Sequence, residues 1–150
     1  MSIDGLEVRP AQPADLDALL VLYGQLADQR AVAPTDEIRQ ALGQMVAASF
    51  VNLLVADRRG EVVGTVELVV VPNVTHGGRP WAQLENMVVG EDVRGLGIGR
   101  ALLQRCAEIA RDHNCYKIQL QSANHRTPAH RFYEAFGFTA SSAGYRWYLS

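Results

Sequence analysis

One stretch of the chain decides the fold: Val93-Arg94-Gly95-Leu96-Gly97-Ile98-Gly99-Arg100-Ala101-Leu102-Leu103. Its glycines stand between a segment with a strand pattern and one with a helical pattern, and they let the backbone turn tightly. In such a turn several N–H groups point at one place, beside the positive end of the helix dipole. The stretch therefore predicts an anion-binding loop at the start of a helix.

Two well-known phosphate-binding loops do not fit this stretch. A Walker loop, GxxxxGK[ST], needs a Lys-Ser or Lys-Thr pair, and the chain contains none. The dinucleotide fingerprint GxGxxG needs a glycine at position 100, where Arg100 stands. Taken alone, a glycine-rich turn without a ligand is the alternative interpretation.

Length and charge limit the partners that such a loop can serve. The 150 residues carry 14 Lys and Arg against 16 Asp and Glu, and 48% of them are hydrophobic. This predicts one globular domain over residues 1–150. The near-neutral balance argues against nucleic acid and acidic membranes as partners, so any anion must be bound by a local device.

The cysteines and the hydropathy pattern indicate where the protein works. Cys106 and Cys115 are too few for a disulfide framework, and no CxxC or Cys/His spacing suggests a metal site. The N-terminus does not resemble a signal peptide, and no apolar run is long enough to span a bilayer. We therefore expect a soluble, cytoplasmic protein without a metal ion.

The remaining pattern predicts an α/β fold with a mixed sheet and helices on its faces. Thr35 is the expected N-cap of the second helix, and Gly137 the expected stop of the last one. The expected strands cover 6–10, 50–56, 62–71, 81–89, 118–120 and 138–149, with a turn at 57–60, and the expected helices begin near 13, 35, 99 and 128.

Two motifs together indicate a family. Arg94-x-x-Gly97-x-Gly99 resembles the acetyl-CoA signature Q/R-x-x-G-x-G/A of the GNAT family of N-acetyltransferases. About forty residues later, Phe132-Tyr133-Glu134-x-x-Gly137-Phe138 resembles the closing segment of that family. The chain is identified as a member, closely over 84–138. The resemblance implies a central mixed, mostly antiparallel sheet, flanked by about four helices and splayed between its fourth and fifth strands.

The resemblance also implies acetyl-CoA as co-substrate. The loop amides would hold its pyrophosphate, and an N–H near Val88 or Val89 would polarise the thioester carbonyl. Many members carry Asn seven residues before the tyrosine, but here Arg126 occupies that position and Asn124 lies two residues earlier. Either residue could contact the pantetheine arm, or Arg126 could contact a phosphate of the coenzyme. The implied coenzyme-binding residues are Met87, Val88, Val89, Arg94, Gly95, Leu96, Gly97, Ile98, Gly99, Arg100, Asn124, Arg126, Ala129 and Tyr133.

Acetyl transfer needs a neutral amine and a proton for the departing thiolate. An alkylamine with a pKa of about 10.4 is only ~0.04% neutral at pH 7, so a general base is useful. By resemblance, Glu85 is the candidate base or ammonium anchor; its alternative is a solvent-facing strand carboxylate. By the same resemblance Tyr133 is the candidate general acid, and a phenol suits this role because its pKa of ~10 lies above the ~8.5 of a thiol, so it stays protonated. Its alternative is a helix tyrosine packed on the sheet.

The acceptor amine is not identified by the sequence. Its site is expected between the first two helices, the loop 72–80 and the C-terminal strand with Tyr145, Arg146 and Trp147. Cys115-Tyr116-Lys117-Ile118 resembles glucosamine-6-phosphate acetyltransferases, and Ala129-His130-Arg131-Phe132-Tyr133 resembles aminoalkylphosphonate acetyltransferases. The acceptors of both branches carry a phosphoryl group, for which Arg30, Arg79, Arg126 or Arg146 could supply the counter-charge.

Two alternative functions fit the same motifs. A protein or peptide N-acetyltransferase would use the same machinery, and a non-catalytic acetyl-CoA sensor would keep the glycine loop without the acid and base. Homodimers are common in the family, and the C-terminal strand is a candidate for such an interface.

Overall fold

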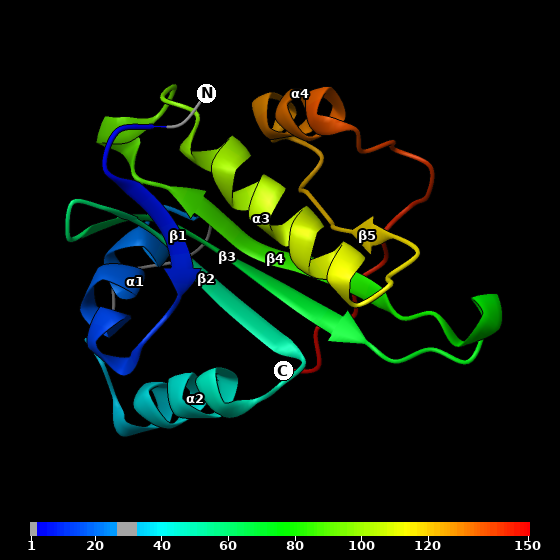
Figure 1. Ribbon diagram of the computed structural model, residues 1–150, viewed down its shortest axis with the longest axis horizontal. Coiled ribbons are helices and arrows are strands. Elements are labelled where there is room, and N and C mark those ends of the chain that lie inside the picture. The colour runs from blue at the N-terminus through cyan, green and yellow to red at the C-terminus, as the bar shows by residue number, and fades with distance from the viewer. Residues whose placement is uncertain (1–2, 27–32) are drawn as a thin grey trace. The chain divides into compact units, whose positions relative to one another are not determined.

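The computed structural model describes residues 3–26 and 33–150, and the chain forms two compact units, 1–119 and 120–150. The elements of the first unit are β1 (Leu6–Pro10), the 3-10 turn η1 (Pro13–Asp15), α1 (Leu16–Tyr23), α2 (Asp36–Ala47), β2 (Val51–Arg58), β3 (Glu61–Val71), η2 (His76–Gly78), β4 (Trp81–Val89), η3 (Glu91–Val93), α3 (Ile98–Asp112) and β5 (Ile118–Gln119) (Figure 1). The second unit contains α4 (Thr127–Phe136).

The sheet of the first unit has the strand order β1-β2-β3-β4-β5. The first four strands are antiparallel neighbours, whereas β5 runs parallel to β4. This last pairing is short, because only Ala82 with Ile118 and Gln83 with Gln119 are partners. Within the described residues, β4 therefore has no strand beside it after Gln83 on this edge. The mixed, mostly antiparallel sheet and its splay after the fourth strand agree with the prediction.

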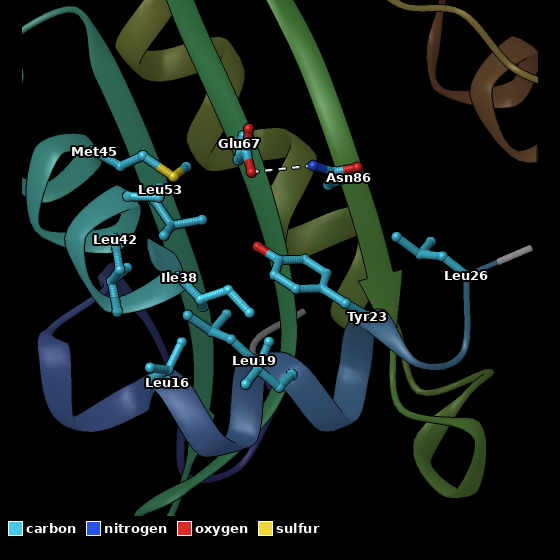
Figure 2. Close-up of a pocket in the computed structure, with 12 residues that line it drawn as sticks. Leu16, Leu19, Tyr23, Leu26, Ile38, Leu42, Met45, Leu53, Glu67 and Asn86 are labelled. Carbon is cyan, nitrogen blue, oxygen red and sulfur yellow. Dashed lines mark hydrogen bonds between the residues drawn. The ribbon is translucent and has the colours of Figure 1, made fainter. Parts of the chain in front are cut away.

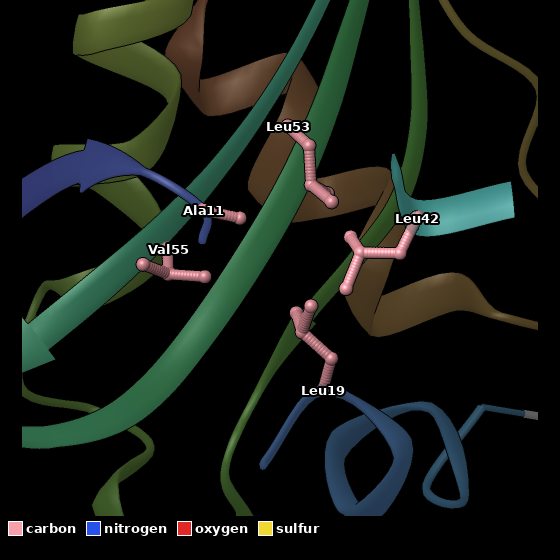
Figure 3. Packing of buried hydrophobic residues seen from close by; sticks show 5 residues of the cluster. All are labelled: Ala11, Leu19, Leu42, Leu53 and Val55. Carbon is pink, nitrogen blue, oxygen red and sulfur yellow. The ribbon is translucent and has the colours of Figure 1, made fainter. Parts of the chain in front are cut away.

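Helices cover both faces of this sheet. On one face, side chains of α1, α2 and β2, together with the residue that follows β1, form a buried cluster of Ala11, Leu19, Leu42, Leu53 and Val55 (Figure 3). On the other face Gly64 approaches α3 so closely that a Cβ atom would lie 3.2 Å from Ile98 and 3.3 Å from Leu102. Gly64 pairs with Ala56, the residue after Val55, and successive strand residues point to opposite faces. The sheet is therefore sandwiched between α1 and α2 on one side and α3 on the other.

Local signals in the sequence set the ends of several elements. The Thr35 hydroxyl accepts a hydrogen bond from the Ile38 N–H at 3.2 Å and caps α2 as predicted. The turn between β2 and β3 is shorter than expected: it consists of Arg59 and Gly60, with φ of 54° and 89°. Two central residues with positive φ match the right-handed twist of a hairpin. Residues 57 and 58 of the expected turn therefore belong to β2.

An ion-pair network fixes the beginning of α1. The Arg9 guanidinium donates to both Asp15 oxygens at 2.9 and 3.0 Å and to Asp57 at 3.1 Å. The Gln12 N–H also donates to Asp15, at 2.8 Å. These bonds hold the pKa of Asp15 below its ordinary value. The network ties the segment before α1 to strands β1 and β2.

The second unit differs from the prediction at its end. Helix α4 has proline in its first turn and stops at Gly137, whose φ is 132°. The strand expected over 138–149 is wrong, because these residues have no regular secondary structure. Tyr145 and Trp147 alternate as in a strand but are 93% and 87% exposed. A strand needs a neighbour for its backbone groups, and the described residues of this unit contain no other strand.

Candidate active site

The glycine-rich loop leads into α3 as the sequence predicted. Gly95 and Gly97 have φ of 82° and 89°, and Gly97 is the N-cap of the helix. Residues with a Cβ atom rarely adopt this backbone conformation. The first N–H groups of a helix have no intrahelical acceptor and attract anions. The loop can therefore bind a phosphate group with backbone donors alone.

One side chain of the loop 94–100 is buried in the core, and the others are exposed. Arg94 is exposed, and its Nε donates to the Val89 carbonyl at 3.3 Å, which ties the loop to the end of β4. Ile98 is 1% exposed and packs into the core, so it can contribute only backbone to a ligand. Leu96 and Arg100 are exposed. The predicted coenzyme contacts of these residues stay predictions.

A bulge interrupts β4 close to the predicted base. Thr65 pairs with Val88 and Glu67 pairs with Glu85, so one residue of β3 faces two residues of β4. Asn86, one of those two, has a φ of 48°. Asparagine tolerates this left-handed conformation better than most residues. Sequence reasoning missed the bulge, and the asparagine within a strand pattern was its only signal.

The open edge of β4 carries backbone groups that can meet a ligand. The Gly90 N–H donates to the Val63 carbonyl at 2.9 Å, toward β3. Backbone groups of successive residues point to opposite edges, so the N–H of Val89 points away from β3. On that side the described chain has no strand beyond Gln83. An N–H in this position is the donor that an oxyanion hole requires, and Val89 is one of the two predicted residues.

Glu85 lies at the centre of a polar row on β4. It is exposed, and its Oε1 accepts a hydrogen bond from Gln83 Nε2 at 3.0 Å. Gln119 Nε2 donates to Gln83 Oε1 at 3.0 Å and extends the row to β5. Directly opposite residues of antiparallel strands point to the same face, so Glu85 and Glu67 form a carboxylate pair. This is the face that α1 and α2 cover.

Glu67 is the functional candidate that sequence reasoning missed. It is half-buried, and its Oε1 accepts a hydrogen bond from Asn86 Nδ2 at 3.2 Å. Burial raises the pKa of Glu67, the negative charge of Glu85 raises it further, and the Asn86 bond opposes both effects. Burial also raises the pKa of the neighbouring Tyr23 to about 12, so this phenol is neutral at physiological pH. Nothing in the sequence indicates that two glutamates 18 positions apart face each other.

A cavity of about 340 Å³ opens between α1, α2 and strands β2 to β4. Tyr23, Glu67 and Asn86 are its polar lining residues, and Figure 2 shows the Tyr23 hydroxyl directed toward the other two. No residue of the loop 72–80 lines it in the described structure. Arg79 of that loop donates instead to the carbonyls of Asn114 and Cys115, both at 3.2 Å. The apolar lining residues are Leu16, Leu19, Leu20, Leu26, Ile38, Ala41, Leu42, Met45 and Leu53.

The predicted general acid lies in the second unit. Tyr133 of α4 makes edge-to-face contacts with Phe132 and Phe138, at ring-centroid distances of 5.4 and 5.7 Å. Burial raises its pKa above the ordinary value, and Arg126 opposes this shift. The phenol is therefore protonated at neutral pH. Asn124 and Arg126 precede α4 and Ala129 lies in its first turn, whereas Arg30 lies outside the described residues.

Neither thiol belongs to this arrangement of groups. Cys106 is fully buried in the core, which raises its pKa to about 12, and Cys115 is half-buried; both are free. Within the described residues, no three His, Cys, Asp or Glu side chains gather as a metal site would need. The same part of the chain contains no helix that is long and apolar enough to cross a membrane.

Comparisons with known proteins agree with this architecture. The profile of the Acetyltransferase (GNAT) family matches residues 21–138. The chain is 33% identical over 135 residues to a glucosamine 6-phosphate N-acetyltransferase of Trypanosoma brucei brucei, and the match covers 90% of each. It is 29% identical over 136 residues to an aminoalkylphosphonate N-acetyltransferase of Salmonella typhimurium, covering 90% of this chain and 86% of that one.

A solved structure is similar along nearly the whole chain. A putative acetyltransferase from Agrobacterium tumefaciens has 36% sequence identity and a TM-score of 0.89, over 95% of this chain and 99% of that one. The predicted fold and the predicted enzyme class are thereby confirmed. The chain belongs to the GNAT family of acetyltransferases and is an N-acetyltransferase.

Proposed function

We propose that this enzyme transfers the acetyl group of acetyl-CoA to a primary amine of a small molecule, by direct attack within a ternary complex. The observation that carries the proposal is the Glu67–Glu85 carboxylate pair, beside an apolar cavity and next to the bulge of β4. Two like charges facing each other are unfavourable without a cation. An ammonium group is such a cation, and the cavity has room for its carbon skeleton.

The coenzyme is assigned to the loop and to the open edge of β4. The amides of 95–99 would hold its pyrophosphate, and the Val89 N–H would polarise the thioester carbonyl. Two observations support this assignment: the positive φ at Gly95 and Gly97, and the edge of β4 beyond Gln83, where the described residues supply no neighbouring strand. In the second unit, Asn124, Arg126 and Ala129 are assigned to the same ligand by their motif positions. All of these contacts are proposals.

The chemistry requires one base and one acid. A carboxylate of the pair takes a proton from the ammonium group, and Glu85 is the candidate that the motif names. The amine nitrogen then attacks the thioester carbon, and the C–S bond breaks. Tyr133 would give a proton to the departing thiolate, because burial raises the pKa of this phenol and keeps it protonated at neutral pH.

The acceptor's second functional group is less defined. Relatives named for glucosamine 6-phosphate and for aminoalkylphosphonates support an acceptor with a phosphoryl group. No Lys, Arg or His is among the described residues that line the cavity, and Arg79 donates to backbone carbonyls elsewhere. The remaining candidate cations for a phosphoryl group are Arg30, Arg126 and Arg146.

A thiol-release assay tests the proposal. Acetyl-CoA is supplied with an aminosugar phosphate, an aminoalkylphosphonate, a polyamine, an uncharged alkylamine or a peptide, and free CoA is measured with a thiol reagent. We expect release with at least one small amine. Release with peptides alone would instead identify a peptide acetyltransferase, and CoA binding by calorimetry without any release would identify a sensor. A single domain over 1–150, a cytoplasmic location, a homodimer and the absence of metal, nucleic acid and membrane partners stay predictions.

A further inference from the structure

The two carboxylates of the pair have different surroundings. Glu85 is exposed, it accepts its hydrogen bond from Gln83, and it is not among the residues that line the cavity. Glu67 is half-buried, and it does line the cavity. An amine bound in the cavity would therefore meet Glu67 first.

One carboxylate and otherwise neutral or apolar groups face Glu67 from the neighbouring elements. From α1 comes Tyr23, which is neutral, and from β4 come Glu85 and the neutral amide of Asn86. Strand β2 places Leu53 directly opposite Glu67. Helix α2 contributes only apolar cavity residues, namely Ile38, Ala41, Leu42 and Met45. In the described part of the chain, neither glutamate is in a salt bridge.

We propose that Glu67 binds the ammonium group of the acceptor and takes its proton, with Glu85 as a second, outer negative charge. The assignment rests on the proposed function and concerns which residue of that site is the base. It makes Asn86 a positioning residue, because its amide donates a hydrogen bond to one oxygen of Glu67, Oε1. The bulge serves this purpose, since the left-handed backbone of Asn86 aims the amide at β3.

Two protons leave the amine nitrogen during the reaction. The acceptor enters as R–NH₃⁺ and gives one proton to a carboxylate oxygen of Glu67, which later releases it to solvent. The lone pair of R–NH₂ forms the N–C bond, and the C–S electron pair leaves with sulfur. The thiolate takes up the proton of Tyr133. The nitrogen loses a second proton, and this proton balances the one that Tyr133 has donated. The net reaction gives the amide, free CoA and one proton.

Two neighbours of Glu67 predict pH shifts of opposite sign. Glu85 raises the pKa of Glu67 by like-charge repulsion, whereas the Asn86 hydrogen bond lowers it by stabilising the carboxylate. Removing the charge of Glu85 should therefore move the acidic limb of the pH–rate profile to lower pH. Removing the Asn86 amide should move that limb to higher pH. A carboxylate with a purely structural role would show neither shift.

The experiment compares Glu67→Gln, Glu85→Gln and Asn86→Gly with the wild type, using the amine of the panel that gives the highest turnover. Glycine at position 86 keeps the positive φ without strain. The matched control is Glu61→Gln, the same change at the exposed first residue of β3. Both kcat and kcat/KM are measured from about pH 5 to about pH 9, the range in which a tuned carboxylate base titrates. Thermal unfolding of each variant is recorded alongside.

We expect Glu67→Gln to lose about 100-fold or more in kcat, together with the acidic limb. Glu85→Gln should lose at most about 10-fold in kcat and shift the acidic limb to lower pH, whereas Asn86→Gly should shift that limb to higher pH. The control Glu61→Gln should match the wild type. Wild-type kcat and an intact acidic limb in Glu67→Gln, with both lost in Glu85→Gln, would overturn the assignment and leave the proposed function standing. If Glu67→Gln does not fold, the variants Glu85→Gln and Asn86→Gly test the assignment. Acidic limbs that move in the same direction in both variants, or that move in neither, would overturn it. If the wild type acetylates no amine, the proposed function fails and this assignment fails with it.

Discussion

Removal of the Tyr133 hydroxyl separates its chemical role from its packing. In Tyr133→Phe the ring remains, and with it the edge-to-face contacts to Phe132 and Phe138 at 5.4 and 5.7 Å. Only the O–H group is lost. The folded structure should therefore unfold at nearly the wild-type temperature, while the departing thiolate loses its proton donor.

The size of the effect follows from the two pKa values. An ordinary phenol lies about 1.5 units above a thiol, so full proton transfer is uphill by about 2 kcal/mol. Burial raises the pKa of Tyr133 and adds to this difference. In the transition state the phenol therefore acts mainly as a hydrogen-bond donor to the developing thiolate, and the proton is transferred afterwards, so its effect lies at the low end of the usual range for general acids. We expect kcat to fall about 100-fold, or about 2.7 kcal/mol of transition-state stabilisation.

The assay is steady-state CoA release at saturating acetyl-CoA, with thermal unfolding measured on the same samples. The control is Tyr148→Phe, which removes the same atom from a side chain that is 79% exposed. It should keep wild-type kcat. Wild-type kcat in Tyr133→Phe at an unchanged unfolding temperature would refute the general-acid role and leave a packing role.

Three further predictions concern the scaffold. Asp15→Asn should lower the free energy of unfolding by about 3 kcal/mol at pH 7; because the Arg9 bonds lower the pKa of Asp15, this difference should shrink below about pH 4, and a loss independent of pH in urea titrations would contradict the ion pair. Gly97→Ala, at a φ of 89°, should lower the free energy of unfolding by about 1–2 kcal/mol and weaken CoA binding in calorimetry. Gly43→Ala inside α2 should instead raise the free energy of unfolding by about 0.5–1 kcal/mol, and a change of the same sign in both variants would contradict the backbone argument. Leu102→Ala, at 0% exposure, should lower the free energy of unfolding by about 2–5 kcal/mol, and a loss of less than about 1 kcal/mol would mean that α3 does not pack on the sheet as described.

Local chemistry made much of the fold predictable. A glycine pair that adopts positive φ marks the loop before α3, Thr35 caps α2, and Gly60 marks the hairpin. Each of these signals acts over a few residues, so a single sequence contains it. The two family motifs then identified the family, because their order and spacing are specific.

Features that depend on pairing between distant segments were not predictable. Glu67 belongs to the candidate site because of the register between β3 and β4, and that register is shifted by the bulge at Asn86. One residue more or less in β4 would turn the side chains to the other face. The error over 138–149 has the same origin, since alternation of Tyr145 and Trp147 says nothing about whether a neighbouring strand exists.

The most direct test of direct attack on acetyl-CoA is the reaction of the wild-type enzyme itself. Acetyl-CoA and the amine of the panel that supports turnover are incubated with enzyme, and amide, free CoA and protein mass are followed together by mass spectrometry. A ternary-complex mechanism predicts amide and CoA in equal amounts, intersecting initial-rate lines and a protein mass that never changes. CoA release without amine, with an acetyl group on the protein, would contradict it.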